Sequence, residues 1–102
     1  MEMVITGDMV DAEEAHRIGL VNLVCEPDEL MGVCRNLAER IARNAPVAVR
    51  YAMEAVNRGL QAGLVEGMRV EEDLFGVVNA TEDVKEGLTA FLEKRKAEFK
   101  GS

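Results

Sequence analysis

The chain has few aromatic residues and little of the chemistry that metal or redox sites require. Tryptophan is absent, and one tyrosine and three phenylalanines are the only aromatic residues among 102. Any packed interior must therefore be built from aliphatic side chains and methionine. Cys25 and Cys34 form no C-x-x-C pair and have no histidine cluster beside them, which disfavours a zinc site and a redox motif. We expect no metal and no bound cofactor.

Long apolar runs and positive net charge are also missing. No run of roughly 18 consecutive apolar residues occurs, as a membrane-spanning helix requires, and Met1 to Val4 do not begin a signal peptide. We therefore expect a cytoplasmic protein without a membrane partner. The formal net charge is −7, which repels polyanions. Nucleic acid is accordingly not expected as a partner.

Apolar residues recur at helical spacing over most of the chain. Asp11 predicts the start of a short helix, with Glu14 in a capping-box position and Gly19 closing it in the left-handed conformation. Longer amphipathic helices are predicted from Asp28 to about Arg43, from Pro46 to Leu60, from Leu64 to Asn79, and from Thr81 as a cap through Leu92. Residues 20–25 are predicted to be extended, with a buried connector as the alternative.

The nineteen carboxylates invite a search for a catalytic pair. Dense runs occur at 13–14, 71–73 and 82–83. Adjacent residues diverge by roughly 100° around a helix axis, so these carboxylates do not converge on one reacting atom and are interpreted as solvated helix faces. His16 has no Cys or Ser nearby in sequence and is interpreted as a surface or packing residue.

Short motifs occur in two groups along the chain. The first comprises residues 3–8 (MVITGD), 11–15 (DAEEA) and 18–22 (IGLVN). The second comprises residues 80–83 (ATED), 85–87 (KEG) and 90–96 (AFLEKRK), with 44–46 (NAP) between the groups. In residues, order and spacing these motifs resemble the enoyl-CoA hydratase/isomerase (crotonase) family, and the resemblance covers essentially the whole chain.

The resemblance implies a mainly α fold, with residues 1–102 forming the C-terminal helical (trimerisation) domain of the crotonase fold. About five helices and at most one short strand-like stretch, near Val21 to Val24, are expected, and Met1 to Ile5 would end a longer helix. The family's upstream ββα spiral, with its two oxyanion donors and two catalytic glutamates, would lie outside this sequence. No catalytic residue is therefore assigned here.

By the same resemblance, Phe91 and Lys94 contact coenzyme A (CoA) bound to a neighbouring subunit. Phe91 would pack beside the adenine, and Lys94 would approach a CoA phosphate. An aromatic face stacks on a base and an ammonium attracts phosphate, so the assignment is chemically sound. The alternative is that Phe91 only fills an apolar stripe with Leu88 and Leu92, while Lys94 only complements the negative end of the helix.

The function implied is hydration of 2-enoyl-CoA thioesters, with this segment supplying subunit contacts for trimers or hexamers and part of the CoA pocket. The family also contains isomerases and hydrolases, which these residues do not distinguish. A second hypothesis is a non-catalytic helical module that associates with copies of itself. It rests on the apolar stripes, which would be exposed if no other domain covered them.

Overall fold

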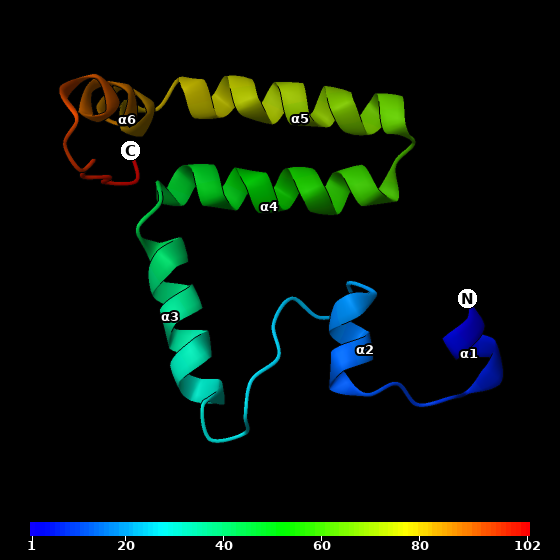
Figure 1. Cartoon of the computed structure of the whole chain (residues 1–102). Coiled ribbons are helices and arrows are strands. Elements are labelled where there is room, and N and C mark those ends of the chain that lie inside the picture. Colours follow the sequence, from blue (N-terminus) through cyan, green and yellow to red (C-terminus); the bar gives the residue numbers. More distant parts are fainter. The chain divides into compact units, whose positions relative to one another are not determined.

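The computed structural model describes all residues from Met1 to Ser102 and contains six helices and no strand. The helices are α1 (Glu2–Thr6), α2 (Ala12–Arg17), α3 (Leu30–Ala42), α4 (Pro46–Gln61), α5 (Leu64–Asn79) and α6 (Glu82–Glu93) (Figure 1). Two compact units divide the chain, Met1–Asn36 and Leu37–Ser102, with the boundary inside α3. The mainly α class is confirmed, and α1 is the additional helix beyond the five expected.

In the first unit, α2 begins as predicted, but only half of its capping box forms. The Asp11 carboxylate accepts a hydrogen bond from the Glu14 N–H at 2.8 Å. The Glu14 carboxylate does not reach back, because it binds the Arg17 guanidinium through two contacts of 2.6 Å. The Glu14 carboxylate therefore binds the charged Arg17 side chain, one turn later, in preference to the neutral backbone amide. Gly19 has the expected left-handed conformation, with φ of 77°.

The strand-like stretch expected near Val21 to Val24 is not a strand. After α2 the chain turns back, and the N–H groups of Leu20 and Val21 donate to the Ala15 carbonyl at 2.8 and 3.3 Å. No neighbouring strand is available in this unit. Since an isolated strand leaves its backbone groups unpaired, the segment is irregular instead.

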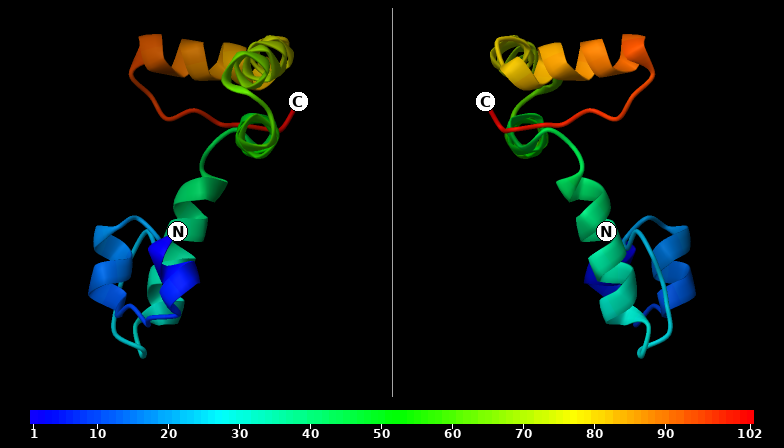
Figure 2. Two further views of the ribbon diagram at one scale, coloured as in Figure 1. Left: turned by 90° about the vertical axis from the view of Figure 1, so that its right-hand side faces the viewer. Right: turned by 90° about the vertical axis from the view of Figure 1, so that its left-hand side faces the viewer.

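In the second unit, α4 and α5 form an antiparallel pair joined by a short turn (Figures 1 and 2). Pro46 occupies the first turn of α4, where its missing N–H costs no hydrogen bond. The two helices approach closely at Gly59 and Gly67, since a Cβ built on Gly67 would lie 3.3 Å from the Gly59 Cα. Figure 2 shows α6 extending to one side from the end of α5, at a steep angle to both helices of the pair.

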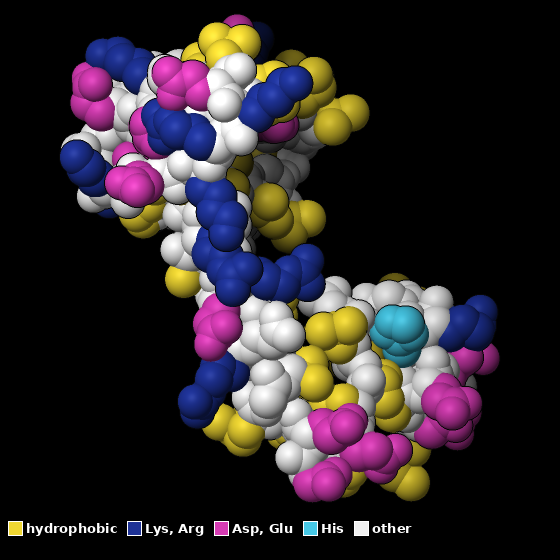
Figure 3. All heavy atoms as spheres, turned by 60° about the vertical axis from the view of Figure 1, so that its left-hand side comes forward, with side chains coloured by type: hydrophobic (Ala, Val, Ile, Leu, Met, Phe, Trp, Pro, Cys, Tyr) yellow, Lys and Arg dark blue, Asp and Glu magenta, His cyan; other side chains and the backbone are white.

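Very little of either unit is buried. Ala15 is the buried apolar residue of the first unit, and Val70, Leu74 and Ala90 are those of the second. Many large apolar side chains lie at the surface, as the yellow atoms of both units show (Figure 3). The predicted apolar stripes therefore exist, but neither unit covers its own. None of the six helices combines the length and apolar character that a membrane span requires.

Candidate functional site

The candidate residues Phe91 and Lys94 lie where α6 ends. Thr81 occupies the N-cap position of this helix, as predicted, but its hydroxyl does not cap α6. It donates to the Val78 carbonyl at 2.7 Å, because the end of α5 presents a free acceptor just before it. At the other end Lys94 adopts the left-handed conformation, with φ of 55° and ψ of 35°. It is the one non-glycine residue with positive φ.

The Phe91 ring is not covered by other side chains of this chain. Its exposed fraction is 80%, and Leu88 and Leu92 are also largely exposed. The buried face of α6 is formed instead by Asp83 and Ala90. Phe91 and Lys94 therefore both face solvent, and an aromatic face and an ammonium are available to a ligand or a second subunit.

Beyond Lys94 the chain reverses and runs back along α6 (Figure 2). We call residues 95–102 the C-terminal strap. Its far end is held by Asp83, whose carboxylate oxygens accept hydrogen bonds from the N–H groups of Lys100 and Gly101 at 2.7 and 2.8 Å. The Asp83 N–H in turn donates to the Ser102 carbonyl at 3.1 Å. Asp83 is 3% exposed, so these hydrogen bonds satisfy a buried charge.

The near end of the strap is held by Glu86 and Arg95. The Arg95 guanidinium contacts both Glu86 carboxylate oxygens, at 2.6 and 2.8 Å, and also Glu93 at 2.7 Å. The Glu98 N–H donates to the Glu86 carboxylate at 2.8 Å. The Arg95 side chain, followed by this N–H, lowers the pKa of Glu86 to about 2. The same ion pair raises the pKa of Arg95.

These contacts predict an acid-sensitive strap. The pKa of Glu86 falls from an ordinary 4.5 to about 2 on folding, so its contribution to stability is complete above 4.5 and disappears as the pH falls toward 2. We expect hydrogen exchange at the Glu98 amide, corrected for intrinsic pH dependence, to accelerate over that range. The variant Glu86→Gln should show no such step, whereas an unchanged step in this variant would contradict the assignment.

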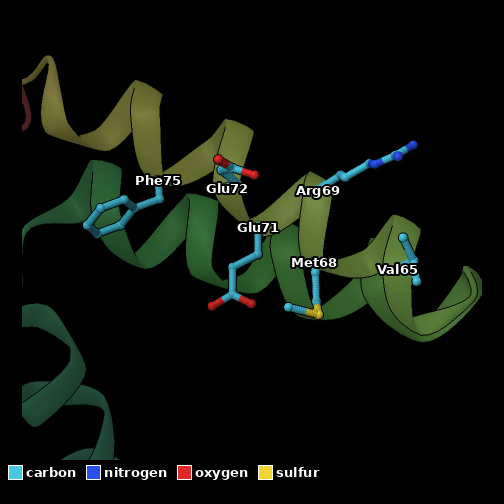
Figure 4. A pocket seen from close by; sticks show the side chains of 6 residues that line it. All are labelled: Val65, Met68, Arg69, Glu71, Glu72 and Phe75. Carbon is cyan, nitrogen blue, oxygen red and sulfur yellow. The ribbon is translucent and has the colours of Figure 1, made fainter.

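The acidic runs do not assemble an acid and base pair. In Figure 4, the side chains of Glu71 and Glu72 leave α5 in different directions. With Arg69 and three apolar residues they line a shallow hollow of about 640 Å³ along this single helix. A second, apolar hollow of about 650 Å³ lies between α4 and α5. No group of three His, Cys, Asp or Glu side chains is placed to hold a metal ion, and His16 is exposed.

The structure thus defines a helical segment with uncovered apolar faces and an exposed aromatic and basic end. The family profile described as enoyl-CoA hydratase/isomerase matches residues 1–102. The chain belongs to this family, as the sequence motifs predicted.

Relatives and solved structures agree with this assignment. The chain is 47% identical over 98 residues to a crotonyl-CoA hydratase from Syntrophomonas wolfei, covering 96% of this chain and 38% of that protein. It is 45% identical to a short-chain-enoyl-CoA hydratase from Clostridium acetobutylicum, covering 95% and 37%. The crystal structure of an enoyl-CoA hydratase from Bacillus anthracis superposes with a TM-score of 0.91 at 40% identity, covering 99% and 39%. The chain therefore spans less than two fifths of these proteins.

Phe91 and Lys94 remain predictions from the family resemblance, whereas the strap is not indicated by the sequence. Asp83 was interpreted only as an acid in the first turn of a helix, and Glu86 was only part of a motif. Their partners lie 9 to 18 residues away, beyond any helical spacing. No local pattern in the sequence indicates such contacts.

Proposed function

We propose that residues 1–102 are the C-terminal helical domain of a cytoplasmic enzyme that adds water to 2-enoyl-CoA thioesters. The observation that carries the proposal is the family match over the whole chain, together with hydratases among the relatives. The segment itself would contribute subunit contacts and part of the CoA pocket. The oxyanion donors and proton-transferring glutamates that the reaction needs would lie outside this segment.

Within that enzyme, Phe91 and Lys94 are proposed to contact the adenine and a phosphate of CoA held by a neighbouring subunit. Two observations support this role. The Phe91 ring is 80% exposed and is not used in packing. Lys94 occupies a left-handed position, where a non-glycine residue costs roughly 1–2 kcal/mol. A lysine kept in a conformation that favours glycine is consistent with a functional demand on its side chain.

The activity is tested by comparing this chain alone with a chimera. In the chimera, the chain replaces the matching segment of the Clostridium acetobutylicum short-chain-enoyl-CoA hydratase. We expect the chain alone to hydrate crotonyl-CoA no faster than the uncatalysed background, and the chimera to turn over. Loss of the enoyl thioester absorbance measures both. Turnover by the chain alone would contradict the absence of catalytic groups, and a folded but inactive chimera would count against the hydratase assignment.

A second candidate function is self-association, which the exposed apolar surface favours. The groove between α4 and α5 is lined mainly by apolar side chains, including the exposed Leu60, Met68 and Phe75. Surfaces of this kind are usually covered in soluble proteins. We propose that copies of the chain cover them in one another, as trimers or hexamers in the complete enzyme.

Sedimentation velocity tests this association. The chain should sediment as an oligomer at micromolar concentration, and Met68→Glu with Phe75→Glu should shift it toward the monomer, because buried charge opposes the interface. Val21→Glu, an exposed apolar position in the first unit, is the matched control. A strictly monomeric wild-type chain would contradict the proposal.

A further inference from the structure

We propose that Glu86, acting through Arg95, is a positioning residue that holds Lys94 in its left-handed conformation and so fixes the direction in which the Lys94 side chain leaves the end of α6. The consequence for CoA binding rests on the proposed function above. The conformational part does not, because it concerns only contacts within the second unit.

Two backbone hydrogen bonds restrain Lys94, one from its own N–H and one from the N–H of the next residue. The Lys94 N–H donates to the Phe91 carbonyl at 3.3 Å, and the Arg95 N–H donates to the Ala90 carbonyl at 3.0 Å. These two hydrogen bonds close α6 and require the left-handed residue between them. The Arg95 side chain then turns back along the helix to Glu86, which lies 9 residues earlier. A change at Glu86 therefore reaches Lys94 through one intervening residue.

A lysine disfavours positive φ, so the left-handed conformation of Lys94 needs the support of the Glu86–Arg95 pair. The contacts that hold the far end of the strap are too distant along the chain to provide that support. A bidentate carboxylate and guanidinium pair restrains both the distance and the orientation of Arg95. Without the Glu86 charge, Lys94 can relax to a right-handed or extended conformation, and the residues directly after it would change direction. The Lys94 side chain would then leave the end of α6 at a different angle.

The far end of the strap is held by contacts that do not involve Glu86. A substitution at Glu86 can therefore be studied while the strap stays attached to α6. Asp83 binds the Lys100 and Gly101 amides, and the Phe99 ring lies against Gly87, where a built Cβ would be 3.5 Å from the ring. Gly101 has φ of 78° and lies against the Pro46 ring. Loss of the Glu86 charge therefore leaves these distal contacts in place while it frees the residues next to Lys94.

The conformational test uses Glu86→Gln in the 102-residue chain, studied by NMR. The intraresidue Hα–HN NOE of Lys94, which is strong at positive φ, should weaken, and amide exchange at Glu98 should accelerate at least tenfold. Glu14→Gln is the matched control, because it removes an equivalent bidentate pair with Arg17 within α2. A strong Lys94 NOE and unchanged Glu98 exchange in Glu86→Gln would overturn the proposal.

The functional test titrates CoA into the chimera that carries the same substitutions, because this segment is proposed to supply only part of the CoA pocket. Glu86→Gln should weaken CoA binding about fivefold, and it should have no further effect when combined with Lys94→Met. If Lys94→Met weakens binding but Glu86→Gln does not, the positioning role is overturned and the proposed function survives. If Lys94→Met leaves CoA binding to the chimera unchanged, the proposed contact fails, and the Lys94 NOE in the 102-residue chain shows whether Glu86 holds Lys94.

Discussion

Asp83→Ala is expected to lower the free energy of unfolding of the second unit by about 2–3 kcal/mol. The substitution removes two hydrogen bonds to a charged acceptor and leaves the Lys100 and Gly101 amides without their partner. It also opens a small gap, because Asp83 is almost completely buried. Urea denaturation followed by circular dichroism measures the loss, and hydrogen exchange should locate it at Lys100 and Gly101.

Asp73→Ala is the matched control for this prediction, since Asp73 is an exposed acid on α5 without a recorded contact to the strap. Its effect should stay within about 0.5 kcal/mol. Asp83→Asn should fall between the two, because an amide keeps one acceptor oxygen and loses the charge. An equal effect of Asp83→Ala and Asp73→Ala would show that the carboxylate does not hold the strap.

Phe91→Ala combined with Lys94→Met is expected to raise the KM of the chimera for crotonyl-CoA on the order of a hundredfold. Base stacking contributes roughly 1–3 kcal/mol and an exposed charge pair adds up to about 1 kcal/mol, and each 1.4 kcal/mol is a factor of about ten. The kcat should change little, because both residues would bind a part of the substrate remote from the reacting carbons. Steady-state hydration kinetics measure both constants.

A truncated substrate provides a stringent control for this prediction. Crotonyl-pantetheine lacks the adenine nucleotide, so the double variant and the parent chimera should have equal KM values for it. Lys85→Met, which removes another exposed cation from α6, should leave the KM for crotonyl-CoA unchanged. If the double variant lowered kcat with either substrate and left KM unchanged, Phe91 and Lys94 would have a different role.

Most of the helical structure could be predicted from local sequence. Apolar residues at helical spacing, Pro46 at a first turn and Asp11 as a cap place α2 to α6 within a few residues of their observed bounds. The backbone bonds of a helix join residues four apart, so the information that specifies a helix is contained within the helix. The motifs likewise identified the family, because they are read directly from the order of residues.

Contacts between distant residues could not be predicted in this way. The extended stretch expected near Val21 to Val24 lacks a partner strand, and whether such a partner exists depends on the rest of the fold. The local pattern of these residues was therefore compatible with more than one structure.

The sequence by itself therefore determined the helical class and the family, and the family resemblance predicts the candidate pair Phe91 and Lys94. Only the tertiary structure showed that the chain reverses after Lys94 and that Asp83 and Glu86 hold the returning strap. The physical reason is that a helix depends on neighbours one turn away. The partners of a buried carboxylate depend on the path of the chain 17 and 18 residues later.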